Sequence, residues 1–141
     1  MKYLSVAGVV FYDNKFNIAV QERGDYAKSG EKYSFWGGKV EEDETPFQAV
    51  KREISEELGF LPEKLSYWDK FTYTFTDPGL YNGCIVTQYV FLAPITEKLM
   101  SAKVGEGKNT VILKLEEVIA GKGFPTGSTN FLKDFRNKIK G

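Results

Sequence analysis

The sequence predicts one domain of the mixed α/β (α+β) class, in which a mixed β-sheet lies between helices. The order of the hydrophobic patterns supports this prediction, because strands come first, then a helix, then further strands, and a helix closes the chain. At 141 residues, the chain has the length of about one domain, so residues 1–141 are expected to fold as a single unit. A composition of 42% hydrophobic and 27% charged residues is ordinary for a protein that buries a core.

Apolar runs that end at turn residues predict the strands. Tyr3–Tyr12 and Phe16–Glu22 flank the turn sequence Asp13-Asn14-Lys15 and therefore predict a β-hairpin. Tyr33–Trp36 predicts a short aromatic strand that ends at a pair of glycines. Later strands are expected at 71–76, where aromatic residues alternate with threonine, and over Cys84–Ala93 and Thr110–Leu115.

The segment Pro46–Leu58 carries the start and stop signals of an α-helix. Thr45 is a good N-cap, Gln48 has the capping-box spacing, and Gly59 suits the position just after the helix. The apolar residues of this segment share one face, which is expected to pack on the sheet. They are Phe47, Val50, Ile54 and Leu58.

A second helix is predicted at the end of the chain. Ser128 or Thr129 is expected to cap it, and Phe131, Phe135 and Ile139 recur at every fourth residue on its core side. This segment is also rich in Lys and Arg, which we interpret either as a solvated outer face or as help in binding an anionic substrate.

The composition excludes several kinds of chemistry. The chain has no histidine, which removes imidazole bases and histidine-ligated zinc, and its one cysteine, Cys84, cannot form an internal disulfide. Lys+Arg and Asp+Glu both number 19, so no basic field is expected to hold duplex nucleic acid or an anionic membrane. No apolar stretch approaches the ~18 residues of a membrane-spanning helix. We therefore expect a cytoplasmic monomer or homodimer that acts on a small molecule.

Three glutamates lie close together on the predicted helix. At ~100° per residue, Glu53, Glu56 and Glu57 fall within an arc of about 100° beside the apolar face. This arrangement is unfavourable by itself, because like charges repel and the last turn of a helix disfavours anions. A solvated acidic surface is one interpretation. A bound cation is the other, and carboxylate oxygens are the ligands that Mg²⁺ prefers, with Mn²⁺ as a substitute.

The order of residues around these glutamates favours the metal site. The stretch from Gly38 to Phe60 reads G-x5-E-x7-R-E-U-x-E-E-x-G-U, where U is a bulky apolar residue. The nine defined positions are filled by Gly38, Glu44, Arg52, Glu53, Ile54, Glu56, Glu57, Gly59 and Phe60. This pattern resembles the signature of the Nudix hydrolases and covers 23 of the 141 residues. The resemblance implies a Nudix-type α/β/α sandwich with a mixed, curved β-sheet between helices.

The resemblance also implies roles for these residues. Nudix hydrolases cleave nucleoside diphosphates linked to another group, X, and require Mg²⁺ or Mn²⁺. The implied metal ligands are Glu53, Glu56, Glu57 and a carbonyl of Gly37 or Gly38. Arg52 is expected to orient a glutamate, and Glu44 to support the site or to serve as the base, with its carboxylate near the first N–H groups of the helix. A further ligand or base is expected from Glu106, with Glu97 as the second choice.

The same resemblance suggests where the substrate lies. Residues similar to those that contact phosphate or base in the mutator-type triphosphate pyrophosphohydrolases are Arg23, Lys39, Phe124, Ser128 and Asn130. One departure from the family pattern is Trp36, which stands where proline is usual. Of Phe35 and Trp36, one is expected to pack in the core and the other to contact substrate.

The function that this resemblance implies is hydrolysis of a (deoxy)nucleoside triphosphate to a monophosphate and pyrophosphate, with removal of oxidised nucleotides as a biological purpose. The sequence carries no clear additional signature of a more specialised subfamily. The alternatives are a dinucleoside polyphosphate hydrolase, a nucleotide-sugar or ADP-ribose hydrolase, and a nucleotide-binding sensor without catalysis.

Overall fold

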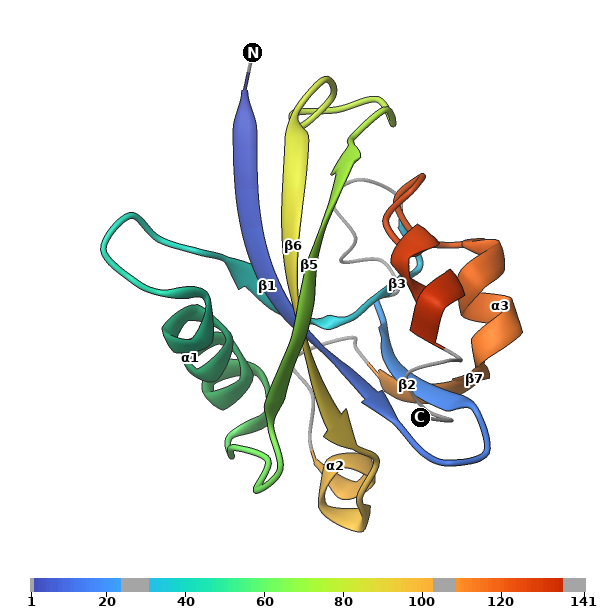
Figure 1. Cartoon of the computed structure of the whole chain (residues 1–141). Helices are drawn as coiled ribbons and strands as arrows, with labels where there is room; N and C mark the ends of the chain where they lie inside the picture. The colour runs from blue at the N-terminus through green and yellow to red at the C-terminus, as the bar shows by residue number, and fades with distance from the viewer. Residues whose placement is uncertain (1, 24–30, 103–108, 136–141) are drawn as a thin grey trace.

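A mixed sheet with helices on both of its faces forms the fold, as Figure 1 shows, and the predicted fold class is confirmed. This computed structural model describes residues 2–23, 31–102 and 109–135. The strands are β1 (Tyr3–Tyr12), β2 (Asn17–Glu22), β3 (Tyr33–Ser34), β4 (Trp36–Lys39), β5 (Ser66–Thr74), β6 (Ile85–Pro94) and β7 (Asn109–Lys114). The helices are α1 (Pro46–Leu58), α2 (Glu97–Ser101), α3 (Leu115–Ala120) and the 3₁₀ helix η2 (Asn130–Asp134).

Strand β1 organises the sheet. It pairs in parallel with β6 along its whole length, and β6 pairs in turn with β5. The other edge of β1 is shared, because β4 pairs with residues 6–9 whereas β2 pairs only with Phe11 and Tyr12. Strand β2 pairs with β7 along its whole length and, after it leaves β1, also pairs with β3. The predicted hairpin is therefore confirmed at its closed end, beside Phe11 and Tyr12. On the N-terminal side of Phe11 the sheet divides into two branches: the β4 branch, which stays paired with β1, and the β2 branch, which does not.

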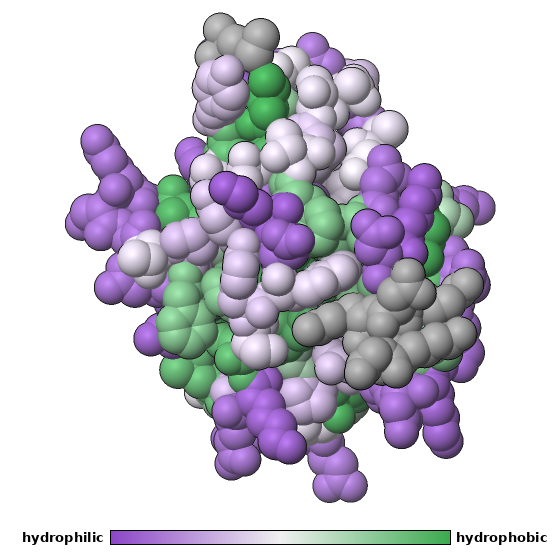
Figure 2. All heavy atoms as spheres, viewed as in Figure 1, coloured by the Kyte–Doolittle hydropathy of each residue, from purple (hydrophilic) through white to green (hydrophobic). Residues whose placement is uncertain are grey.

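Each face of the sheet has its own core. Helix α1 covers one face with Val50, Ile54 and Leu58 buried, as its apolar pattern predicts. Phe47 also packs on the sheet, where it stacks on Phe91 of β6 at 5.6 Å between ring centroids, but unlike the other three it stays 42% exposed. Figure 2 shows hydrophobic surface at the lower left of the molecule, where Figure 1 labels α1, among projecting hydrophilic side chains. Helices α3 and η2 cover the opposite face of the sheet.

The C-terminal segment differs most from the sequence-based expectation. Helix α3, which was not predicted, follows β7 directly and ends at Gly121 in the left-handed conformation, with φ of 80°. Residues 130–134 form a 3₁₀ helix instead of an α-helix, and Thr129 precedes it without a side-chain cap. Phe131 and Phe135 are buried as expected, whereas Ile139 lies outside the described residues. Within the described ranges, no helix has the length and apolar character needed to cross a membrane.

Candidate functional site

Helix α1 begins and ends where its signals predict. Thr45 Oγ1 accepts a hydrogen bond from Gln48 N at 3.2 Å, and Gln48 Oε1 accepts one from Thr45 N at 2.8 Å, which completes the capping box. Gly59 ends the helix with φ of 80°, a conformation that glycine adopts without strain. These caps fix the ends of the helix and therefore the positions of the three glutamates in its second half.

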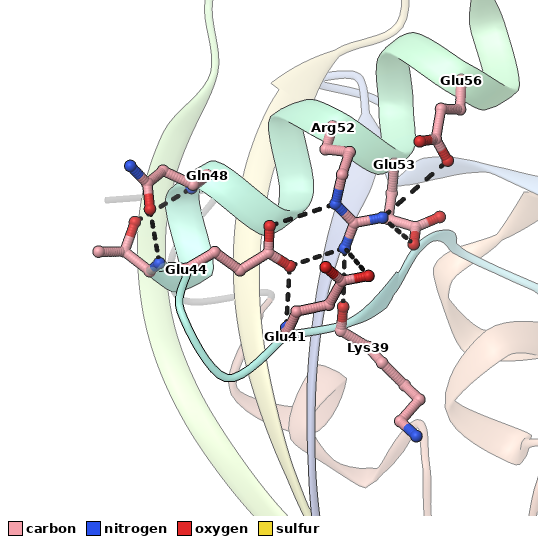
Figure 3. A network of polar contacts seen from close by, with 8 residues as sticks. Lys39, Glu41, Glu44, Gln48, Arg52, Glu53 and Glu56 are labelled. Carbon is pink, nitrogen blue, oxygen red and sulfur yellow. Dashed lines mark hydrogen bonds and ion pairs between the residues drawn. The ribbon is translucent and has the colours of Figure 1, made fainter.

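Arg52 is the centre of the polar network on α1 (Figure 3). Its Nε and Nη2 donate to the two carboxylate oxygens of Glu44, at 3.2 and 2.7 Å. Its Nη1 donates to Glu53 Oε1 at 2.8 Å and lies 4.0 Å from Glu56 Oε2. Arg52 Nη2 also donates to the Lys39 carbonyl at 3.1 Å. A single guanidinium therefore joins the helix, the loop before it and strand β4, and one of its hydrogen bonds is to Glu53.

The charged forms of Glu44 and Arg52 are favoured by their hydrogen bonds. Hydrogen bonds from Arg52 and from the Glu41 N–H hold the pKa of the Glu44 carboxyl below its usual value of 4.5. The pKa of Arg52 is raised, chiefly by its hydrogen bonds to Glu44 and Glu53. Glu44 was expected near the first N–H groups of α1. It lies instead against Arg52 and the Glu41 N–H, because a two-point ion pair offers stronger partners than the end of the helix.

Glu57 is held by elements outside α1. Its Oε1 accepts a hydrogen bond from Gly37 N at 3.0 Å, and its Oε2 accepts one from Gln21 Nε2 at 3.0 Å. Strands β4 and β2 therefore each contribute one donor to this carboxylate. Its orientation is set by groups that lie far away in the sequence.

The glycine pair lies inside β4, where a turn after a strand was expected. Gly37 has φ of 147°, and a Cβ there would lie 2.1 Å from the Ala7 carbonyl oxygen on β1. A Cβ on Gly38 would lie 2.5 Å from the carboxyl carbon of Glu53. Glycine is thus required at 37 by the backbone of the neighbouring strand, whereas a Cβ at 38 would displace the Glu53 carboxylate.

The acidic side chains offer oxygen ligands but do not form a closed metal site by themselves. Within the described residues, no three acidic side chains lie close enough together to hold an ion, because Glu53 is turned to Arg52 and Glu57 to Gly37. The oxygen-only donors suit a hard divalent cation, which Glu53 could bind through Oε2 while its Oε1 accepts the hydrogen bond from Arg52. Glu106 lies outside the described residues, and Glu97 is exposed at the start of α2.

A cavity of about 260 Å³ adjoins the glycine pair, and none of the three glutamates of α1 is among its lining residues. Residues from β4, β6 and the loop before η2 line it together with the glycines. Arg23, Phe35, Phe124 and Ser128, all expected substrate contacts, are among these lining residues. The rings of Phe35 and Phe124 lie 5.5 Å apart with an interplanar angle of 30°. An aromatic cavity and an acidic helix edge therefore meet at Gly37 and Gly38.

Two expected substrate residues, Lys39 and Asn130, have other surroundings. Trp36 is among the residues that line the cavity, but it is fully buried and packs edge-on against Phe11 at 5.2 Å, so it is the core member of the Phe35–Trp36 pair. The Lys39 side chain points away from the carboxylates in Figure 3, and its carbonyl is the group that contacts Arg52. Asn130 is exposed at the start of η2 and is not among the residues that line the cavity.

Three residues of the site were not found by sequence reasoning. Gln21 supports Glu57, and Tyr73 and Gln88 line the cavity. Burial raises the pKa of Tyr73 to about 12, so its phenol is neutral and able to donate a hydrogen bond. Gln88 Nε2 donates to the Ser128 carbonyl at 3.1 Å. In the sequence, all three are marked only as polar residues within a predicted strand. Many exposed strand residues are also polar, so this feature does not identify a site.

The chain resembles known proteins in sequence over most of its length. The family model described as NUDIX domain matches residues 2–135. The chain is 32% identical over 105 residues to the 8-oxo-dGTP diphosphatase of Proteus vulgaris, a match that covers 74% of this chain and 92% of that protein. It is 39% identical over 77 residues to the 8-oxo-dGTP diphosphatase of Escherichia coli (strain K12), which covers 55% of this chain and 60% of that protein.

Solved structures share the fold. The crystal structure of MutT protein from Methanosarcina mazei Go1 matches with a TM-score of 0.72 at 19% identity and covers 99% of this chain and 97% of that one. The crystal structure of C. elegans Ap4A hydrolase matches with a TM-score of 0.67 at 18% identity and covers 97% of this chain and 98% of that one. At these identities, the likeness concerns the fold.

Proposed function

This chain belongs to the NUDIX domain family, and from that premise we propose that it hydrolyses (deoxy)nucleoside triphosphates with Mg²⁺, or with Mn²⁺ as a substitute. The products are a nucleoside monophosphate and pyrophosphate. The observation that carries the proposal is the meeting of an acidic helix edge and an aromatic cavity at Gly37 and Gly38. A nucleotide bound across these glycines would place its base in the cavity and its phosphates beside the carboxylates.

The reaction is a displacement at phosphorus by water. Glu53, Glu56 and Glu57 are proposed to hold the metal, which when bound offsets phosphate charge and lowers the pKa of a water molecule. The water oxygen forms a bond to phosphorus while the anhydride P–O bond breaks, and the bridging oxygen leaves with the electron pair. A carboxylate of the site accepts the proton of the water. Arg52 keeps Glu53 in place through its hydrogen bond at 2.8 Å.

The cavity favours a flat base with polar edges. Phe35 and Phe124 offer aromatic surfaces for stacking, which is worth ~1–3 kcal/mol per base. Gln88, Tyr73 and Ser128 supply polar groups among the lining residues. Two relatives carry the name 8-oxo-dGTP diphosphatase. We therefore propose 8-oxo-dGTP as the first substrate to assay, with removal of oxidised nucleotides as the purpose.

A substrate panel tests this proposal. Purified protein is incubated with Mg²⁺ or Mn²⁺ and with dGTP, 8-oxo-dGTP, a dinucleoside polyphosphate, a nucleotide sugar or ADP-ribose. We expect equal amounts of monophosphate and pyrophosphate from the triphosphates, and no turnover after a chelator is added. Turnover of the sugar- or dinucleotide-linked substrates alone would show that the proposed substrate class is wrong.

The alternative of a sensor without catalysis is tested by Glu57→Gln. This change keeps the shape of the side chain but replaces one acceptor oxygen by an NH₂ group that faces the Gly37 or Gln21 donor. We expect turnover to fall by orders of magnitude while the protein stays folded, with a small loss of thermal stability. A wild-type protein that binds nucleotide tightly and turns over none of the panel would instead be a sensor.

A further inference from the structure

Gln21 is a fully buried polar residue near the end of β2, directly after its apolar residues 18–20, with an exposed fraction of 0%. Along β2, Ile18 and Val20 face the core under α3 and η2, whereas Ala19 faces the core under α1. The alternation of a strand places Gln21 on the α1 side. An apolar residue would continue this pattern without a polar group to satisfy. The choice of glutamine at this position therefore calls for an explanation.

The amide nitrogen of Gln21 supports Glu57. Nε2 donates to Glu57 Oε2 at 3.0 Å and lies 3.4 Å from the Phe35 carbonyl oxygen. In the described part of the chain, Gln21 Oε1 is buried and accepts no hydrogen bond. The amide thus orients its nitrogen toward Glu57 while its oxygen stays unsatisfied, which disfavours the folded state. A side chain present for stability alone would not be expected to accept this cost.

The position of Gln21 explains what the hydrogen bond accomplishes. Strand β2 has already left β1 at this point, so Gln21 lies on the β2 branch of the divided sheet, paired with Ser34 and Thr110. Gly37, which donates to the other oxygen of Glu57, lies on the β4 branch. One carboxylate is therefore held from both branches. Because a carboxylate oxygen has two lone-pair sites, an oxygen that accepts one of these hydrogen bonds can also bind a metal ion.

We propose that Gln21 is a positioning residue that holds the Glu57 carboxylate in the orientation in which it takes a divalent cation. The inference rests on the proposed function, since it assumes that Glu57 is a metal ligand. Gln21 acts through Glu57 and contacts neither the nucleotide nor the reacting atoms. Partners that orient a metal ligand in this way typically change metal affinity or activity by about 10–100-fold when they are removed.

The test is a titration with Mn²⁺ in the absence of nucleotide, followed by the electron paramagnetic resonance of free Mn²⁺. Gln21→Met keeps the length of the side chain and removes the donor. We expect Gln21→Met to raise the Mn²⁺ dissociation constant about tenfold or more, with a thermal unfolding midpoint that is unchanged or higher. The matched control is Thr110→Val, which removes from the strand opposite Gln21 a buried hydroxyl that has no hydrogen-bond partner among the described residues. This control should leave the dissociation constant unchanged.

A double-mutant cycle separates positioning from a general structural role. In a Glu57→Gln background, Gln21→Met should have no further effect on Mn²⁺ affinity, because the ligand through which it acts has been altered. If Gln21→Met fails to fold, Gln21→Asn takes its place, since the shorter amide retracts the donor from Glu57. The same weakening is expected of it.

Three results would overturn the inference. One is an unchanged Mn²⁺ affinity in folded Gln21→Met, and another is an equal weakening by Gln21→Met in the wild-type and Glu57→Gln backgrounds. If the wild type binds Mn²⁺ and hydrolyses nucleotides in either case, the proposed function stands without the inference. The third result is a wild type that binds no Mn²⁺, and it would remove the proposed function and the inference together.

Discussion

The Arg52 guanidinium binds the Glu44 carboxylate at two points, through Nε–Oε2 at 3.2 Å and Nη2–Oε1 at 2.7 Å. Glu44 lies just before α1 and Arg52 lies at the middle of the helix, so the pair ties the preceding loop to the helix. The same guanidinium donates to Glu53, a proposed metal ligand. The position of Glu53 therefore depends on Glu44 through a shared arginine.

Replacing Arg52 by lysine tests this dependence. Arg52→Lys keeps the positive charge but removes the planar fork that binds Glu44 and Glu53 together. We expect kcat to fall about 10–100-fold because Glu53 loses its fixed orientation, together with a lower thermal unfolding midpoint. Steady-state kinetics and thermal unfolding measure the two effects. Lys51→Arg, one residue earlier on the helix, is the control and should leave both unchanged. Equal kcat in Arg52→Lys would show that charge alone suffices.

The ion pair also predicts how stability depends on acid. The pKa of Glu44 is lower in the folded protein than its usual value of 4.5, because Arg52 and the Glu41 N–H bind the charged form. The stabilisation is therefore present above that value and is lost as the pH falls through the lower, folded pKa. We expect the unfolding midpoint to fall less steeply in Glu44→Gln than in the wild type between about pH 5 and about pH 3. Parallel curves would contradict the role given to Glu44.

The two glycines of β4 are expected to respond differently to a methyl group. In Gly38→Ala, the new Cβ meets the end of the flexible Glu53 side chain, which can move away. We expect a change in unfolding free energy below about 1 kcal/mol but a large loss of turnover. In Gly37→Ala, the Cβ meets the Ala7 backbone at a positive φ. A loss of roughly 2–4 kcal/mol in unfolding free energy is expected there. Denaturant unfolding measures the stability of both variants, and steady-state kinetics measures their turnover. Similar unfolding free energies for Gly37→Ala and Gly38→Ala would contradict the expected difference.

Gln88 is expected to act on nucleotide binding and not on the chemical step. Its amide nitrogen is used by the Ser128 carbonyl, which leaves its oxygen as an acceptor at the cavity that contains Phe35 and Phe124. Gln88→Met should raise KM for the preferred nucleotide by roughly tenfold, the value of one hydrogen bond, with little change in kcat. Thr87→Val, on the opposite face of β6, is the control. A fall in kcat at constant KM would place Gln88 in the chemical step instead.

Local patterns predicted the part of the site that lies on one helix. Thr45, Gln48 and Gly59 mark the ends of α1, and helical spacing alone places Glu53, Glu56 and Glu57 along one edge. The orienting role of Arg52 was implied by the resemblance and stays a prediction, although Arg52 does donate a hydrogen bond to Glu53. The helix ends and the shared edge depend on residues close together in the sequence, so local signals are enough to reveal them.

Contacts between distant segments could not be predicted in this way. The support of Glu57 by Gln21 and Gly37 depends on the point at which β2 leaves β1, and strand alternation does not specify that point. The sequence also left open which of Phe35 and Trp36 enters the core. The helix α3 was missed because its six residues are too few for a clear hydrophobic period.

The most direct measurement of the central claim is a crystal structure with Mn²⁺, located by its anomalous scattering. The account predicts a peak within bonding distance of carboxylate oxygens from Glu53, Glu56 and Glu57. Protein that turns over nucleotides in Mn²⁺ yet shows no peak beside α1 would contradict it.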